Sequence, residues 1–233
     1  KIKRKKIIVI KSTVATGTTA RLQKKFKKHI FLFNPEFLTE QNAWEDMLHP
    51  DRQIVGFLGR NREVAELVLS LLPQAPLMSP GIYGDKELKI SATEAEIIKY
   101  AGNIFLARKI NWANALAIST EHLGGNYNNV RIGFGADKRI GPSHLNVDHG
   151  GYRGFGGFCF PKDLDGFMSF ARSEKLKDVL ALLQADRDFN EGLLKKQGLS
   201  LAEVSLHIDE VEKVIKFKKH KKYARKNQQK AQE

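Results

Sequence analysis

A long segment without proline occupies the middle of the chain and limits the folds open to it. It opens at Ser91, where a glutamate three residues later completes the pattern of a capping box, and runs to the paired glycines Gly124 and Gly125. Apolar side chains recur along it at helical spacing, at Ile97, Ala101, Ile104, Phe105, Ile110, Ala113, Leu116 and Ala117. The segment is therefore predicted to form one helix, well above the usual length, which suits a scaffold or a subunit interface.

Upstream of this helix, apolar runs alternate with helix-forming segments. Three runs rich in β-branched and aromatic residues are typical of strands buried in a parallel sheet: residues 7–10, 30–33 and 52–59. The segments at 16–29 and 61–72 are predicted helices, the first capped by Thr16 or Thr18. We therefore expect residues 1–85 to form part of a doubly wound α/β sheet, with ligands at the carboxyl ends of its strands.

Downstream, residues 163–196 carry leucine, phenylalanine and alanine at helical spacing, which predicts further helices packed on a core. Residues 86–200 are accordingly assigned to an all-helical central domain. Residues 201–233 turn polar and then basic, which predicts a solvated, frayed or disordered tail. The fold class is thus α/β, with a partial Rossmann-like parallel sheet followed by a helical domain built on one long helix.

Composition excludes several classes of protein. A single cysteine among 233 residues rules out an internal disulfide and an all-cysteine zinc site, and it fits a reducing compartment, so we expect a cytoplasmic protein with no metal site. No apolar run approaches the roughly 18 residues of a membrane span. The net charge of +13 is concentrated at the two ends without a recognition motif, so nucleic acid is not the favoured partner.

The cysteine, Cys159, lies between a glycine-rich stretch and a predicted helix. Glycines before it would let the backbone approach a ligand, and a helix amino terminus with Lys162 nearby would stabilise a thiolate. The GFGG run lacks the spacing of a dinucleotide fingerprint. Taken alone, these residues leave two alternatives open: a buried structural cysteine, which is the commoner case, and a nucleophile.

Lys99 and Asn103, four residues apart on the long helix, share one face. They are either a solvent-facing pair or, if Lys99 faces a cleft, a means of stabilising an anion.

Five blocks of sequence, in this order and at these separations, resemble the UDP-glucose 6-dehydrogenases over about residues 5 to 197: IIVIKSTVATGTT, FNPEFLTEQNAWEDMLHPDRQIVGF, TEAEIIKYAGNIFLARKINWANALA, RIGPSHLN and RGFGGFCFPKDL. The resemblance implies that residues 1–85 are the carboxyl-terminal part of an NAD-binding Rossmann domain and that residues 86–200 form a dimerisation and substrate domain. It also implies a twofold, NAD-dependent oxidation of UDP-glucose to UDP-glucuronate, in which a cysteine forms a thiohemiacetal and then a thioester.

The resemblance also assigns catalytic roles. Cys159 is the implied nucleophile, Lys99 and Asn103 stabilise the oxyanion, and Asp163 orients the lysine or a water. Glu40 resembles the glutamate of thioester hydrolysis, and Thr13 the threonine that positions a water beside it. Such chemistry needs an activated thiolate, an oxyanion partner and a base.

Binding roles follow from the same blocks. The implied substrate-binding residues are Glu36, Phe37, Leu38, Thr39, Glu40, Lys99, Asn103, Tyr152, Arg153, Gly154, Phe155, Gly156 and Arg139, the last reaching the substrate of a neighbouring subunit. The implied NAD-binding residues are Ser12, Thr13, Val14, Glu40, Cys159 and Lys162. A homodimer through the long helix is implied as well.

The family's glycine-rich pyrophosphate fingerprint is not found in the sequence, and a basic tail stands where the family continues into a third domain. We therefore expect a chain truncated at both ends, with little NAD reduction by itself. Three alternatives remain open: an inactive fragment serving as a sugar-nucleotide-binding or oligomerisation module, a GDP-mannose 6-dehydrogenase, and a basic protein that binds nucleic acid through its tail.

Overall fold

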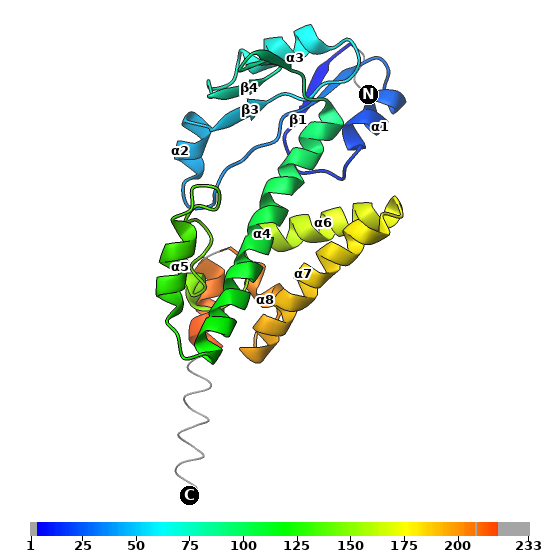
Figure 1. Ribbon diagram of the computed structural model, residues 1–233. Helices are drawn as coiled ribbons and strands as arrows, with labels where there is room; N and C mark the ends of the chain where they lie inside the picture. Colours follow the sequence, from blue (N-terminus) through cyan, green and yellow to red (C-terminus); the bar gives the residue numbers. More distant parts are fainter. Residues whose placement is uncertain (1–3, 208, 219–233) are drawn as a thin grey trace, which may run out of the picture. The chain divides into compact units, whose positions relative to one another are not determined.

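The computed structural model describes residues 4–207 and 209–218, and the chain divides into two compact units between Gly102 and Asn103 (Figure 1). Helix α4 (Ala92–His122, 31 residues) is continuous across that division. The long helix predicted from sequence is confirmed, and so is its capping box. The Ser91 amide donates to the Glu94 carboxylate at 2.6 Å, and the Glu94 amide donates to the Ser91 hydroxyl at 3.2 Å.

The first unit is built from short parallel strand pairs with helical connections. Strand β1 (Ile7–Ile10) is parallel to β2 (Ile30–Phe33), with Ile10 opposite Phe33 and α1 (Thr18–Lys25) between them. Strand β3 (Arg52–Ile54) is parallel to β4 (Leu77–Ser79) and is joined to it through α3 (Arg62–Leu69). These elements confirm the strands and helices predicted for the first 72 residues.

Besides β4, three further elements of this unit were not predicted. A short helix, α2 (Ala43–Leu48), follows the loop after β2. Strands β5 (Gly81–Tyr83) and β6 (Lys86–Leu88) form an antiparallel hairpin before α4. These elements are only 6, 3 and 3 residues long, so each offers too few positions to show an apolar period.

The core of the first unit explains why β2 is apolar at every position. Ile30 and Leu32 pack with Ala65 and Leu69 of α3, whereas Phe33 packs in a second cluster with Ala92 and Ala95 of α4. Because successive side chains of a strand point to opposite faces, β2 is buried on both.

The sequence-based prediction for the start of α1 is wrong. The cap position is held by Gly17 in a left-handed conformation (φ 83°), without a side-chain cap from Thr16 or Thr18. The carboxylate of Glu96, from α4, accepts the backbone N–H groups of Gly17 and Thr19 instead. A buried carboxylate at this end of a helix satisfies the exposed amides and matches the helix dipole.

Gly56 gives a test of how closely α4 packs on the end of β3. A Cβ added there would lie 2.7 Å from the Cβ of Ala95 and 2.8 Å from the Cα of Ala92. Gly56→Ala should therefore lower the free energy of unfolding by about 1–3 kcal/mol. In the control Gly102→Ala, an added Cβ meets nothing within 4 Å among the described residues, and the alanine should be neutral or stabilise α4 by up to about 1 kcal/mol. Chemical denaturation of both variants measures the difference, and equal effects would contradict the packing described.

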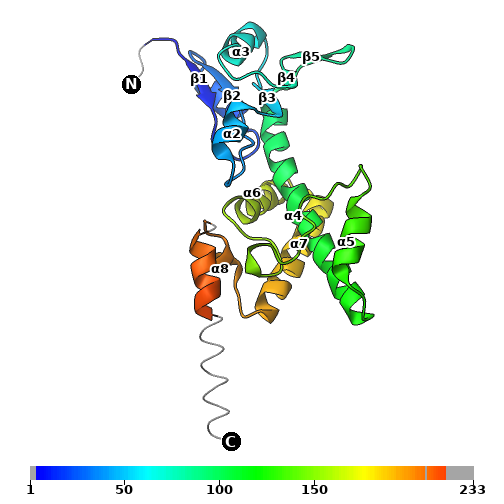
Figure 2. The same ribbon diagram turned by 90° about the vertical axis from the view of Figure 1, so that its left-hand side faces the viewer.

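The second unit is helical, apart from its loops. It contains the rest of α4, α5 (Tyr127–Gly135), a 3-10 turn (His149–Gly151), α6 (Cys159–Ser173), α7 (Lys177–Lys196) and α8 (Leu201–Val204). Helices α6 and α7 lie side by side (Figures 1 and 2). Helix α5 was not predicted. The helical stretch predicted to end near Lys196 does so, but it breaks at Lys175, which has a positive φ of 58°.

Three apolar clusters hold the second unit together. In one, Ala107 of α4 packs with Phe155 and with Leu164, Met168 and Leu183 of α6 and α7. In the second, Ala113 and Ala117 of α4 pack with Tyr127, Leu145 and Val147. In the third cluster, Val204, Val211 and Ile215 pack with Leu194 and Leu199. The tail predicted for residues 201–233 is therefore not solvated at these three positions, and residues 219–233 lie outside the described residues. Among the residues that the structure describes, no helix combines the length and apolarity that a membrane crossing needs.

Candidate active site

Cys159 is the first residue of α6 and is exposed. The sequence placed it just before a helix. The structure places it within the first turn, where unpaired backbone N–H groups and the positive end of the helix dipole stabilise an anion. Exposure disagrees with the alternative of a buried structural cysteine. Pro161 falls in the same turn, where a missing N–H costs no helical hydrogen bond.

Asp163 lies four residues after the cysteine and is completely buried. Its Oδ2 accepts a hydrogen bond from the Asn103 side-chain amide at 2.5 Å, and its Oδ1 pairs with the ammonium group of Lys162. Two of the residues predicted to be catalytic, Asn103 and Asp163, are therefore in direct contact in the second unit. Lys162, predicted to contact NAD, neutralises the carboxylate next to it in the chain.

Lys99 belongs to the first unit and is only 7% exposed, which excludes the alternative of a solvent-facing pair. Its Nζ donates to the backbone carbonyl of Glu36 at 2.7 Å and lies 3.4 Å from the Glu36 carboxylate. The same ammonium group is 6.0 Å from the ring centre of Phe37, and Arg52 of β3 lies 3.8 Å from that ring. Two cations thus hold the start of the predicted substrate loop.

The rest of that loop is exposed. The amide of Leu38 donates to the Glu36 carboxylate at 2.9 Å. The amide and hydroxyl of Thr39 donate to one oxygen of Asp46 in α2, and these hydrogen bonds lower the pKa of Asp46. Glu40 follows at the exposed end of the loop.

Ser12, Thr13 and Val14 follow the carboxyl end of β1. Because β1 and β2 are parallel and in register, this segment and the loop at Glu36 leave the same edge of the strand pair. Ser12 is exposed, Thr13 is half-buried, and the buried hydroxyl of Thr16 has no hydrogen-bond partner among the described residues. These groups fit the polar nicotinamide end of a dinucleotide. The amino terminus of α1 does not fit the pyrophosphate, because Glu96 already occupies it.

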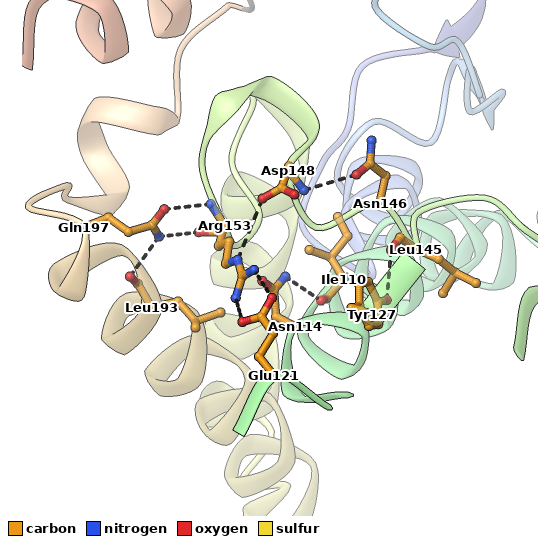
Figure 3. A network of polar contacts seen from close by, with 10 residues as sticks. All are labelled: Ile110, Asn114, Glu121, Tyr127, Leu145, Asn146, Asp148, Arg153, Leu193 and Gln197. Carbon is orange, nitrogen blue, oxygen red and sulfur yellow. Dashed lines mark hydrogen bonds and ion pairs between the residues drawn. The ribbon is translucent and has the colours of Figure 1, made fainter. Parts of the chain in front are cut away.

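Arg153, in the predicted sugar-nucleotide loop, is held by two carboxylates (Figure 3). Its guanidinium group makes two hydrogen bonds to Glu121 of α4, one of them 2.8 Å long, and lies 3.8 Å from the carboxylate of Asp148. These side chains line a polar cavity of ≈ 280 Å³ together with Tyr127 and Asn146. Arginine pairing lowers the pKa of Glu121.

Two amide side chains, one within α7 and one at its carboxyl end, bind the backbone of the loop that carries Arg153. Asn190 is fully buried; its Oδ1 accepts the Phe155 amide at 2.7 Å and its Nδ2 donates to the Phe155 carbonyl at 3.0 Å. Gln197 makes the equivalent pair with the Arg153 amide and carbonyl, both at 2.8 Å (Figure 3). Neither Asn190 nor Gln197 was predicted from the sequence to belong to the site. The one available signal was the position of Asn190, seven residues after Leu183, because residues two helical turns apart lie on the same face.

The glycines of this loop make room for the protein itself at two positions. Gly154 has a φ of 109°, and an added Cβ there would lie 2.6 Å from Oδ1 of Asn190. A Cβ at Gly156 would lie 2.9 Å from the Cβ of Val204 and closer still to the Tyr152 hydroxyl. The expectation that these glycines leave space for a ligand is therefore incomplete, because close packing on α7 and α8 requires them too.

Burial raises the pKa of Tyr152 to about 12. An acid whose pKa is higher in the folded than in the unfolded state contributes stability below the unfolded pKa near 10, and this stability is lost as the pH rises to about 12. The native protein should therefore lose stability between these two values. Tyr152→Phe should weaken that dependence, as measured by denaturation at several pH values and by phenolate absorbance. An identical pH profile in the variant would contradict the assignment.

Arg139 lies apart from these groups in the second unit. Its side chain is 89% exposed and pairs with Asp137 at 2.6 Å. Among the described residues, no group of three or more histidine, cysteine, aspartate or glutamate side chains could hold a metal ion.

The structure can be compared with solved structures. A UDP-glucose dehydrogenase from Pyrobaculum islandicum is 35% identical, with a TM-score of 0.66 over 84% of this chain and 45% of the other. A UDP-D-ManNAc dehydrogenase from Pyrococcus horikoshii has a TM-score of 0.64 at 20% identity, covers 83% of this chain and 46% of the other, and supports the fold alone. The fold is therefore the one seen in these dehydrogenases, with a Rossmann-type part followed by helices.

The family can be stated more narrowly. Residues 1–72 match the NAD binding domain of the UDP-glucose/GDP-mannose dehydrogenase family, and residues 93–192 match its central domain. The chain belongs to this family. The UDP-glucose 6-dehydrogenase of Rickettsia typhi is 40% identical over 73% of this chain, and that of Arabidopsis thaliana, numbered 3, is 34% identical over 75%. The chain spans 38% and 36% of the length of these two relatives.

Proposed function

We propose that this chain carries the substrate-oxidising part of an NAD-dependent UDP-glucose 6-dehydrogenase. The observation that carries the proposal is an exposed cysteine in the first turn of α6, four residues before a buried aspartate bound to Asn103. The family match and the names of the relatives support NAD as cofactor and UDP-glucose, ahead of GDP-mannose, as substrate. A cytoplasmic location remains a prediction, based on the single cysteine.

The proposed chemistry forms and breaks one bond to sulfur. Bound NAD would accept a hydride in each of two oxidations. After the C6 alcohol has become an aldehyde, the Cys159 thiolate adds to its carbon, and loss of the second hydride leaves a thioester. Water activated through Glu40 and Thr13 then breaks the C–S bond and releases UDP-glucuronate and the thiol. Lys99 and Asn103 would stabilise the oxyanion formed when sulfur adds and when water attacks.

Binding roles complete the proposal. Glu36, Phe37, Leu38 and Thr39, with residues 152–156, would hold the sugar nucleotide, and Ser12, Thr13 and Val14 would approach the nicotinamide. The division into residues 1–85 and 86–200 described from sequence is kept as part of this proposal.

The test mixes the chain with UDP-glucose and NAD, alone and with the parts of the Rickettsia typhi relative that lie outside the match, supplied as separate polypeptides. Two NADH formed per UDP-glucuronate, in either mixture, supports the proposal. If UDP-glucose stays unchanged in both mixtures while the intact relative oxidises it, the proposal is overturned. The chain would then be a module for binding or assembly.

A homodimer through α4 is also proposed. Large apolar side chains stand exposed on α4 and α7: Phe105 is 66%, Trp112 55% and Leu182 53% exposed. Trp112 and Leu182 line one groove with Phe189. Trp112→Glu would introduce a charge into a buried interface and should convert a dimer to a monomer in light scattering. The control Leu71→Glu alters a side chain that is 77% exposed beyond α3 and should leave the mass unchanged. A monomeric unsubstituted chain contradicts the proposal.

A further inference from the structure

Glu96 is a charged residue that the proposed chemistry does not use. Its carboxylate is completely buried, and both of its oxygens accept hydrogen bonds from the start of α1. Oε2 accepts the Gly17 amide at 2.5 Å, while Oε1 accepts the Thr19 amide at 2.8 Å and the Thr19 hydroxyl at 2.6 Å. A buried charge is tolerated only with such partners, so this contact fixes α1 to α4 at one point.

Neighbouring residues of α4 hold the two loops that follow β1 and β2. The Tyr100 hydroxyl donates to the carbonyl of Val14 at 3.2 Å, and Lys99 donates to the carbonyl of Glu36 at 2.7 Å. Glu96, Lys99 and Tyr100 lie within five positions of one helix, so they share neighbouring faces. The segment 12–19, which carries Thr13, is thereby tied at Val14, Gly17 and Thr19 to the part of α4 that carries Lys99.

We propose that Glu96 is a positioning residue, which holds the segment 12–16 where Thr13 and Val14 meet the nicotinamide and the hydrolytic water. The inference rests on the proposed function for what that segment does, and on the contacts above for what Glu96 does. A displacement of about 1 Å in a reacting group costs on the order of 100-fold in rate, so the carboxylate should affect turnover without touching substrate.

Glutamine is the informative substitution because it keeps the shape of Glu96. One amide oxygen can still accept from Thr19, but the amide NH₂ then faces the Gly17 N–H, and two donors repel. Thr19→Val removes one of the three hydrogen bonds and keeps the charge, so its effect should be smaller. The matched control is Glu94→Gln, which alters the capping box on the same helix, where Glu94 pairs with Ser91.

The experiment measures two quantities in each variant. In the NAD and UDP-glucose assay described above, Glu96→Gln should lower kcat about 10- to 100-fold, with KM for UDP-glucose within about twofold. Amide hydrogen exchange of the chain should be about tenfold faster at residues 13–17 in Glu96→Gln. Glu94→Gln should leave kcat and the exchange rates at residues 13–17 within about twofold of the unsubstituted values. This should hold even if its midpoint of unfolding falls as much as that of Glu96→Gln.

Each outcome decides the inference. The inference is supported if Glu96→Gln shows both the lower kcat and the faster exchange and Glu94→Gln shows neither. It is overturned if only one of the two quantities changes, or if both variants change equally. If Glu96→Gln does not fold, Thr19→Val is judged by the same criteria. If the unsubstituted chain forms no NADH in any mixture, the proposed function fails. Exchange at 13–17 then decides alone whether Glu96 positions the segment.

Discussion

Replacing Cys159 by serine should lower the rate of UDP-glucuronate formation by a factor on the order of 10³ or more. A serine hydroxyl stays protonated near neutral pH and cannot offer the thiolate that adds to the aldehyde. The first hydride transfer does not need sulfur, so the variant should form at most one NADH per substrate and accumulate the aldehyde. Because the side chain is exposed and the exchange is nearly isosteric, the fold should be unchanged.

The control for Cys159→Ser is Ser173→Ala at the other end of α6. The Ser173 hydroxyl donates to the Phe170 carbonyl at 2.8 Å and lies far along the same helix, so its loss should affect neither turnover nor the fold by a large factor. Quantifying NADH and UDP-glucuronate together separates the two half-reactions. Product formed by Cys159→Ser at the unsubstituted rate would contradict the nucleophile assignment.

Replacing Asn190 by alanine should give the largest loss of stability. Asn190 and Phe155 are both buried, and the substitution leaves the Phe155 amide and carbonyl without partners. A buried unsatisfied polar group costs about 1–3 kcal/mol, so we expect the free energy of unfolding to fall by about 2–4 kcal/mol. The loop at 152–156 should loosen as well, and calorimetry should show weaker binding of UDP-glucose.

The matched control for this variant is Gln184→Ala on the same helix. The Gln184 side chain is half-buried, and its hydrogen bond to Asp188 at 2.7 Å is exposed to solvent, so its loss should cost at most about 0.5 kcal/mol. Chemical denaturation of both variants gives the comparison. A loss for Asn190→Ala no greater than that for Gln184→Ala would show that Asn190 does not hold the loop.

Local patterns predicted most of the fold. Residues 7–10 and 30–33 could be assigned because strands buried on both faces are apolar at each position, and Ser91 with Glu94 marked the start of α4 through a contact within one turn. Helix α5 escaped because glycine, asparagine and arginine weaken its apolar pattern. The break at Lys175 was not predicted because apolar residues continue at helical spacing on both sides of it.

Fewer of the site residues could be predicted from local sequence patterns. Cys159 and Lys99 each had a structural alternative, and the choice between them came from the resemblance of five blocks to a known family. Glu96 and Asn190 could not have been found, because their partners lie 77 and 35 residues away along the chain. A buried carboxylate and a buried amide look like ordinary polar residues until tertiary packing shows which amides they bind.

The central claim is that Cys159 lies in a sugar-nucleotide site, and affinity labelling tests it most directly. A haloketone linked to UDP would alkylate the thiolate: a C–S bond forms, halide leaves, and intact-protein mass spectrometry records one adduct. We predict that the UDP-linked haloketone labels Cys159 much faster than the same haloketone without UDP does. UDP-glucose should slow this labelling. Labelling at equal rates by both reagents, unaffected by UDP-glucose, would contradict the account.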